Sequence, residues 1–204
     1  RTPLRLKHYS QPSPMKQKLN VTGLILAGGA GRRVGKRDKG LISWQGKPLV
    51  AHVSNCLKPQ VSELLISCNR NFARYGEFST QTITDNREDF QGPLAGLEGA
   101  SPFILTDFLV VVSCDTPHLP KDLVSRLIAP LSGTTNDSPE ISYVHDGVRA
   151  QYLCAAMRRD CLTSVTHYLN EGHRAVRDWY KTRHAVTVDF SDCESSFRNY
   201  NRLT

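Results

Sequence analysis

Short apolar runs alternate along the chain with segments in which apolar residues recur every three or four positions. The run Val21 to Leu26 predicts a buried strand that leads into a glycine-rich loop. The continuous run Phe108 to Val112 is typical of a strand that is covered on both faces. The first half of the chain is therefore expected to hold strands at 21–26, 41–44, 62–68, 81–85 and 108–114, and helices at 48–59, 93–100 and 119–131.

The pattern changes after a polar loop at 132–139. Two strand-like runs flank the turn Asp146-Gly147, which predicts a hairpin. Because strands alternate with helices over most of the chain, we predict an α/β fold, with three layers (α/β/α) around a mostly parallel, Rossmann-like sheet. The second half is expected to hold strands at 141–145, 149–157 and 185–190, helices at 158–170 and 174–183, and a closing segment at 197–200.

The composition fits one soluble globular domain, with 204 residues of which 39% are hydrophobic and 22% are charged. The apolar runs are far shorter than the roughly 20 residues that a membrane-spanning helix needs. We therefore expect a cytoplasmic protein with no membrane partner. The six cysteines are scattered without a Cys-x-x-Cys pair, which favours buried free thiols over a zinc site or a disulfide framework.

The formal net charge of +7 is concentrated at the N-terminus. Residues 1–20 hold five of the 26 basic residues and none of the 19 acidic ones, so residues 21–204 carry a charge of only +2. Three prolines interrupt this basic segment, and we interpret it as a disordered or added tail in front of a single domain at 21–204. Nucleic-acid binding would rest on this tail alone, so no nucleic-acid partner is expected.

The segment Leu26 to Leu41 contains glycines at 28, 29, 31, 35 and 40, with Arg32 and Lys39 among them. Glycines let backbone N–H groups converge on phosphate oxygens, and the two cations add charge, so a polyphosphate ligand is indicated. The spacing excludes a P-loop, which would need a glycine at Ala30 and a hydroxyl residue at Arg37. It also misses the dinucleotide fingerprint by one residue. A plain glycine-rich turn with a solvated basic face is the alternative.

Two aspartates follow predicted strands. Asp115 comes directly after the apolar run 108–114, and Asp85 ends the run that begins at Gln81. In open α/β sheets ligands bind beyond the carboxyl ends of the strands, where both aspartates and the glycine loop are expected. A magnesium ion that bridges phosphate oxygens prefers such a carboxylate, so Asp115 is a candidate metal ligand. A turn or helix cap is the alternative role, and it is stronger for Asp85.

At these residues the sequence resembles the molybdopterin guanylyltransferases, the MobA family. The family pattern is Leu-Ala-Gly-Gly, an arginine, a glycine and then Asp-Lys, which corresponds here to Leu26 to Gly29, Arg33, Gly35, Asp38 and Lys39. The resemblance extends over residues 21–201 through segments 46–49, 92–96, 114–117, 144–147 and 190–192 and through Asn199 and Asn201.

The resemblance implies a nucleotide-diphospho-sugar-transferase-like fold and transfer of GMP from GTP to the phosphate of Mo-molybdopterin, with release of pyrophosphate. Residues 21–131 would bind the nucleotide and residues 132–204 the pterin, while Asp115 would hold Mg2+. Molybdoenzyme chaperones or cofactor-delivery proteins are expected partners. The implied residues are Arg32, Lys39 and Asp115 for catalysis; Leu26, Ala27, Gly28, Gly29, Lys39, Ser67, Asn69, Asp85 and Asp115 for GTP; and His145, Arg149 and Asn199 for the pterin side.

Two departures from the family pattern stand out. Ser67-Cys68-Asn69-Arg70 stands where the family often has Asn-x-Asn-Arg, so a nucleotide contact there is either weakened or taken over by Asn69. Tyr152 stands where a proline is frequent.

Other functions remain open on the sequence alone. A molybdopterin cytidylyltransferase or a sugar-phosphate nucleotidyltransferase would share the architecture, but relatives that use CTP tend to have Leu-Ala-Ala-Gly, so Gly28 favours guanine. A non-catalytic GTP-binding regulatory protein belongs to a different class. It would bind GTP without releasing pyrophosphate, and the presence of both Lys39 and Asp115 favours the enzyme.

Overall fold

The computed structural model describes residues 20–29, 38–88, 91–135 and 137–200. Its centre is a seven-stranded mixed sheet in the order β5-β4-β1-β6-β8-β7-β9. The first four strands in this order are parallel, β8 is antiparallel to both of its neighbours, and β9 is parallel to β7. The strands are β1 (Val21–Leu26), β4 (Glu63–Ser67), β5 (Gln81–Ile83), β6 (Phe108–Ser113), β7 (Ile141–His145), β8 (Ala150–Arg158) and β9 (Ala185–Asp189).

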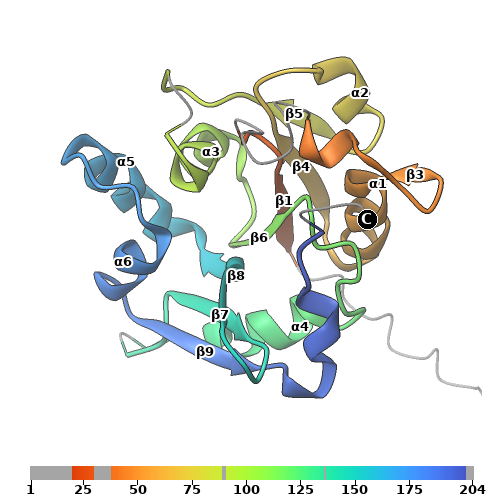
Figure 1. Cartoon of the computed structure of the whole chain (residues 1–204). Helices are drawn as coiled ribbons and strands as arrows, with labels where there is room; N and C mark the ends of the chain where they lie inside the picture. Colours follow the sequence, from red (N-terminus) through yellow and green to blue (C-terminus); the bar gives the residue numbers. More distant parts are fainter. Residues whose placement is uncertain (1–19, 30–37, 89–90, 136, 201–204) are drawn as a thin grey trace, which may run out of the picture.

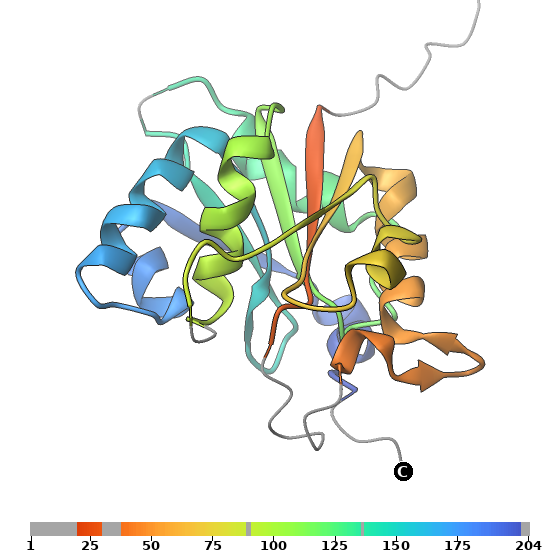
Figure 2. The ribbon, with the colours of Figure 1, turned by 90° about the horizontal axis from the view of Figure 1, so that it is seen from above.

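Helices cover both faces of this sheet, as Figures 1 and 2 show. Helices α1 (Leu49–Leu57) and α4 (Leu123–Ile128) pack on one face, and α3 (Pro93–Ala100), α5 (Thr163–Asn170) and α6 (Val176–Lys181) pack on the other. Side chains of β1 alternate between the two cores because successive residues of a strand point to opposite faces. The predicted three-layer α/β/α fold with a mostly parallel sheet is confirmed.

Strand β1 lies between β4 and β6, although β4 and β5 precede β6 in the sequence. The chain therefore builds outward on one side of β1 and then crosses to the other side. Such a reversal places a crevice at the carboxyl ends of the central strands, where α/β sheets bind their ligands.

The segment after the glycine loop differs from the prediction. A strand was expected at 41–44, but Lys39–Leu41 form a 3-10 turn, η2, and the strand β2 is limited to Ser43–Trp44. Strand β2 pairs with β3 (Lys47–Pro48) in a hairpin. Gln45 and Gly46 both have positive φ angles, 47° and 78°, as a tight two-residue hairpin turn requires.

Three predicted helices are clearly too long, among them the one expected at 174–183, which is α6 at 176–181. The helix expected at 119–131 is α4 at 123–128, and a 3-10 segment that contains Pro130, which has no backbone N–H, continues the chain to 132. The helix expected at 158–170 begins only at 163, after the 3-10 segment η6 (Arg159–Leu162). The remaining short elements are α2 (Phe72–Gly76), η3 (Lys58–Gln60), η4 (Ser101–Phe103), η5 (Ala129–Ser132) and η7 (Ser191–Phe197).

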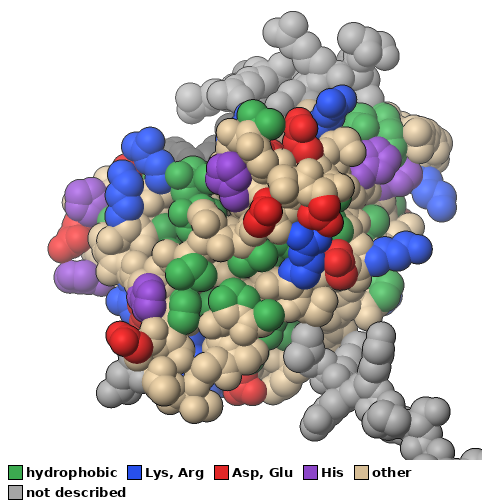
Figure 3. Space-filling model, turned by 90° about the horizontal axis from the view of Figure 1, so that it is seen from below, with side chains coloured by type: hydrophobic (Ala, Val, Ile, Leu, Met, Phe, Trp, Pro, Cys, Tyr) green, Lys and Arg blue, Asp and Glu red, His purple; other side chains and the backbone are tan. Residues whose placement is uncertain are grey.

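Acidic and basic side chains are intermingled on the face shown in Figure 3, in keeping with the nearly balanced charge of residues 21–204. An ion pair joins α4 to η7, where Arg126 makes two hydrogen bonds to the Asp192 carboxylate, of 2.9 and 3.0 Å, and lies 3.8 Å over the Phe190 ring. Among the described residues, no helix is both long and apolar enough to span a membrane.

Candidate functional site

The carboxyl ends of three neighbouring strands are in register. Leu26 at the end of β1 pairs with Ser67 on β4 and with Ser113 on β6. The Ala27 N–H donates to the Ser67 carbonyl at 2.8 Å, and the Cys114 N–H donates to the Leu26 carbonyl at 3.2 Å. The residues that follow each strand therefore leave the sheet at one edge, as the sequence predicted.

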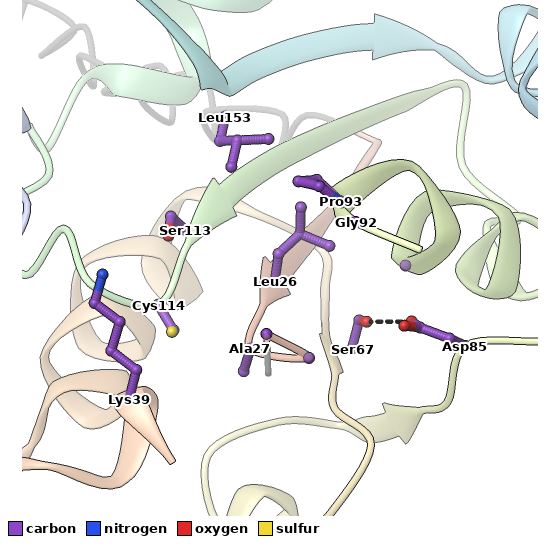
Figure 4. A pocket seen from close by; sticks show the side chains of 13 residues that line it. Leu26, Ala27, Lys39, Ser67, Asp85, Gly92, Pro93, Ser113, Cys114 and Leu153 are labelled. Carbon is purple, nitrogen blue, oxygen red and sulfur yellow. Dashed lines mark hydrogen bonds between the residues drawn. The ribbon is translucent and has the colours of Figure 1, made fainter. Parts of the chain in front are cut away.

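A cavity of about 400 Å³ lies at this edge, and Figure 4 shows the side chains that surround it. Its floor is formed by the ends of β1, β4 and β6, and the start of α3 closes one side. The cavity is mostly apolar with a few polar groups, which is typical of small-molecule sites. The lining residues are Leu26, Ala27, Gly28, Gly29, Lys39, Ser67, Asp85, Gly92, Pro93, Gly96, Ser113, Cys114 and Leu153.

Lys39 and Asp115 form an ion pair beside this cavity. Asp115 is buried, with 3% of its surface exposed, and its carboxylate also accepts a hydrogen bond from the Ser113 hydroxyl. A buried carboxylate needs such partners because burial disfavours its charge. The pair brings together two of the three residues that the sequence singled out for catalysis, from segments 76 positions apart.

Asp38, the residue before Lys39, is tied to α2 and to the loop before it. Its carboxylate accepts hydrogen bonds from the Tyr75 hydroxyl and from Asn71 Nδ2, the latter at 2.9 Å, and lies 3.5 Å from Arg70 Nε. The Asp38 side chain is only 8% exposed. The residue belongs to the Asp-Lys motif, but sequence analysis gave it no role, since its partners lie more than 30 positions away.

A second polar cluster lies on the opposite side of the cavity. Asn69 Nδ2 donates to Asp85 Oδ2 at 2.7 Å, and the Asp85 N–H donates to Asn69 Oδ1 at 3.0 Å. The Ser67 hydroxyl donates to the other Asp85 oxygen at 3.4 Å. Burial raises the pKa of Asp85, although the hydrogen bonds from Asn69 and Ser67 oppose the shift.

Gly28 lies directly against this cluster. A Cβ atom at position 28 would lie 3.1 Å from Asn69 Nδ2 and 3.7 Å from Asp85 Oδ2. Because the first distance is tighter than ordinary packing, a side chain at this position would require Asn69 to shift by a few tenths of an ångström. The residue that distinguishes Leu-Ala-Gly-Gly from Leu-Ala-Ala-Gly therefore packs closely against Asn69.

A smaller cavity of about 260 Å³ adjoins the first. Arg149 and Asn199, both expected on the pterin side, line it, and Asn199 Oδ1 accepts a hydrogen bond of 3.4 Å from the Thr116 hydroxyl. His145 instead lies at the end of β7, where its Nδ1 accepts from the Gly147 N–H at 3.2 Å. The structure thus brings Arg149 and Asn199 to this cavity, whereas His145, the last residue of β7, is not among the residues that line it.

The C-terminal segment is fastened to the loop that follows Asp115. The Tyr200 N–H donates to the Asp115 carbonyl at 2.9 Å, and the Tyr200 hydroxyl lies 3.1 Å from His118 Nε2. The Tyr200 ring also packs on Trp44 of the β2-β3 hairpin, with centroids 4.8 Å apart. These contacts hold Asn199 beside the smaller cavity.

Comparison with known proteins gives a family for this site. A family model described as "MobA-like NTP transferase domain" matches residues 23–187. The chain belongs to the MobA-like NTP transferase family. Curated relatives include a "Molybdenum cofactor guanylyltransferase" of Shewanella piezotolerans, 38% identical over 90% of this chain and 88% of that protein, and one of Shewanella sp. strain MR-4, 39% identical over 90% and 91%.

Solved structures agree on the fold of this MobA-like protein. Molybdopterin-guanine dinucleotide biosynthesis protein A from Archaeoglobus fulgidus matches with a TM-score of 0.68 at 20% identity, over 88% of this chain and 92% of that one. A 4-diphosphocytidyl-2C-methyl-D-erythritol synthase from Anaerococcus prevotii matches with a TM-score of 0.68 at 8% identity, over 94% and 95%. The predicted family, fold and enzyme class, a nucleotidyltransferase of the molybdenum cofactor guanylyltransferase type, are confirmed.

The structure places most predicted site residues of this MobA-like enzyme around the two cavities. Arg32, Arg33, Gly35 and Asn201 lie outside the described residues. Ser113 and Leu153 were missed, although they line both cavities. A signal for Ser113 existed, since it directly precedes the Cys-Asp-Thr-Pro segment, whereas Leu153 is one of several apolar residues in a strand and has no distinguishing pattern.

The shifted pKa of Asp85 leads to a prediction about stability and binding in this MobA-like enzyme. Because burial raises the pKa of Asp85 in the folded state, its ionised form destabilises the fold at neutral pH, and this cost disappears as the pH falls through the raised pKa. We therefore expect Asp85→Asn to raise the melting temperature at neutral pH. The difference in melting temperature between neutral and mildly acidic solution should become smaller than in the unmodified chain. The same change should weaken GTP binding.

Thermal unfolding at several pH values, together with nucleotide titration, checks both effects. The conservative variant Asp160→Asn, at a side chain that is 90% exposed, serves as the control. A lower melting temperature for Asp85→Asn at neutral pH, with unchanged GTP affinity, would show that Asp85 is a structural cap.

Proposed function

We propose that this chain transfers GMP from GTP to the phosphate of Mo-molybdopterin, releasing pyrophosphate and forming the molybdopterin guanine dinucleotide. The observation that carries the proposal is the pair of adjoining cavities with Lys39 and Asp115 beside the point where they meet. A nucleotidyl transfer needs two substrates to face each other across one reacting phosphorus. The names of the curated relatives support guanine and the molybdenum cofactor as those substrates.

The larger cavity is the proposed GTP site. The N–H groups near Gly28 and Gly29 and the Lys39 ammonium would bind the phosphates, while Asp85, held by Asn69 and Ser67, would accept hydrogen bonds from the nucleoside. Phosphoryl-type transfer requires little covalent chemistry from the protein, so positioning and charge neutralisation provide most of the rate.

The smaller cavity is the proposed acceptor site. Arg149 brings a guanidinium group, which suits a phosphate, and Asn199 and Thr116 bring neutral hydrogen-bonding groups that suit a pterin ring. The acceptor phosphate would then face the larger cavity across Ser113 and Leu153. His145, at the end of β7, does not line this cavity, so we leave it out of the proposed acceptor site.

The residues beside the ion pair fit a magnesium ion. The Asp115 carboxylate and the Ser113 hydroxyl are the hard oxygen donors that Mg2+ prefers, and no group of three or more His, Cys, Asp or Glu side chains forms a complete metal cage within the described part of the chain. That suits magnesium, which is usually bound by one or two carboxylates together with water and phosphate oxygens. When bound, it would neutralise charge on the nucleotide phosphates.

Nucleotide selectivity tests the guanine assignment. Isothermal titration with GTP, CTP and ATP in the presence of Mg2+ is expected to give tighter binding of GTP. The Gly28→Ala variant is expected to weaken GTP binding by several-fold, because the added Cβ displaces Asn69. Preference for CTP in the unmodified chain would instead support a cytidylyltransferase, and GTP binding without any pyrophosphate release would support a regulatory protein.

A further inference from the structure

Two residues, Ser113 and Leu153, line both cavities. Ser113 is the last residue of β6, and its hydroxyl donates to the Asp115 carboxylate. Leu153 comes from β8 on the other side, and Figure 4 shows its side chain reaching toward Leu26 and Pro93. One wall of the junction between the cavities is therefore polar and joined to Asp115, while the other is a single aliphatic side chain.

An irregularity in β8 places Leu153 at this junction. Along the β7-β8 pair, Tyr143 is opposite Ala155 but the next residue, Val144, is opposite Gln151, so Tyr152, Leu153 and Cys154 form an insertion without partners on β7. On the other side, the pairing of β8 with β6 ends at Cys154. Leu153 therefore lies just beyond the part of β8 that pairs with β6 and within the insertion that faces β7, at the edge of the sheet where the ligands are expected.

The insertion is held firmly on either side of Leu153. The Tyr180 hydroxyl donates to the Tyr152 carbonyl at 2.9 Å, and the Tyr152 ring packs on those of Tyr143 and Tyr180 with centroids 5.3 and 6.0 Å apart. Cys154 is 5% exposed and belongs to the core on the α1 and α4 face. Because both neighbours are anchored, the backbone fixes the direction in which Leu153 projects.

We propose that Leu153 is the apolar wall that keeps water away from the α-phosphorus of bound GTP, so that only the acceptor phosphate can attack. This inference rests on the proposed function. An open junction would admit water as a competing nucleophile, and enzymes that transfer reactive groups exclude water to prevent such side reactions. An aliphatic side chain at the junction offers water no hydrogen bond.

The two reactions are chemically parallel. In transfer, an oxygen of the acceptor phosphate forms a bond to the α-phosphorus while the bond from that phosphorus to the pyrophosphate oxygen breaks. In hydrolysis, a water oxygen forms the new bond, the same bond to pyrophosphate breaks, a proton passes to solvent, and the products are GMP and pyrophosphate. The ratio of free GMP to dinucleotide product therefore measures how well the wall excludes water.

The experiment compares Leu153→Ala with Leu153→Met, which keeps the volume and apolar character, and with Leu105→Ala at a remote side chain that is 78% exposed. Each protein is incubated with GTP, Mg2+ and Mo-molybdopterin, and GMP and dinucleotide are separated by ion-exchange chromatography. We expect the ratio of GMP to dinucleotide to rise by about 10-fold or more in Leu153→Ala because water reaches the phosphorus. Leu153→Met and Leu105→Ala should keep the ratio of the unmodified chain.

A merely structural Leu153 would lower both products together and leave their ratio unchanged, and this result would overturn the proposal. If thermal unfolding shows that Leu153→Ala does not fold, the ratio of GMP to dinucleotide is measured for the milder variant Leu153→Val instead, and the same outcomes apply. Failure of the proposed function has a different signature, because the unmodified chain would then yield no dinucleotide.

Discussion

Replacing Asp115 with asparagine is expected to reduce the rate of GMP transfer by about 1,000-fold. Removal of a group that stabilises charge in an active site typically lowers the rate by a factor of this size. The variant removes the negative charge next to Lys39 but keeps the shape of the side chain and an oxygen that can accept from Ser113. If Asp115 holds the divalent ion, the variant should also need far more Mg2+ to reach its residual rate. Pyrophosphate release measured over a range of Mg2+ concentrations checks both effects.

The fold should survive this change. The Lys39 side chain is 27% exposed, so solvent can compensate part of the ammonium charge when its carboxylate partner is lost. A melting temperature within several degrees of the unmodified chain is expected, and Asp160→Asn is the matched control at the surface. Full activity in a folded Asp115→Asn variant would refute the metal and catalytic roles of this carboxylate.

Replacing Lys39 with methionine is expected to have the second large effect. The rate of GMP transfer should fall by about 100-fold or more, because the phosphate charge is no longer neutralised. Methionine keeps much of the aliphatic length of lysine, so the loss reports on the ammonium group. The variant also leaves Asp115 without the cation that balances it, which should weaken GTP binding further. Steady-state kinetics together with GTP titration separates the effect on rate from the effect on affinity.

Lys58, an exposed residue of η3, provides a control for the general loss of positive charge. Lys58→Met should retain the rate and affinity of the unmodified chain. If Lys39→Met behaved in the same way, Lys39 would be an ordinary surface lysine and the proposed phosphate site would lose its cation.

The central strands could be predicted from sequence because parallel strands buried on both faces need continuous apolar runs, as at Phe108 to Val112. Helix ends were less predictable. Residues 119–131 carry helical spacing throughout, but the helix is confined to 123–128, with Pro120 before it and Pro130 in the 3-10 segment after it. Similarly, the 3-10 turn Lys39–Leu41 follows Asp38, whose side-chain partners Asn71 and Tyr75 are distant in sequence.

The candidate site was predictable where a residue follows a strand. Asp85 and Asp115 each lie two residues after the end of a parallel strand, β5 or β6. The topology alone therefore brings both residues to one edge of the sheet. Leu153 could not be found in this way, because its position depends on the insertion in β8. This insertion shifts the pairing of β8 with β7, and the sequence pattern does not reveal such a shift. The sequence assigned Asn69 to the nucleotide site, but its double hydrogen bond to Asp85 emerges only from the fold.

The most direct test of the account is an assay of the unmodified chain with GTP, Mg2+ and Mo-molybdopterin, followed by mass spectrometry of the pterin and measurement of pyrophosphate. We expect a pterin product that is heavier by one GMP unit, formed in equal amount with pyrophosphate and dependent on both substrates. Binding of GTP with no modified pterin and no pyrophosphate would contradict this expectation.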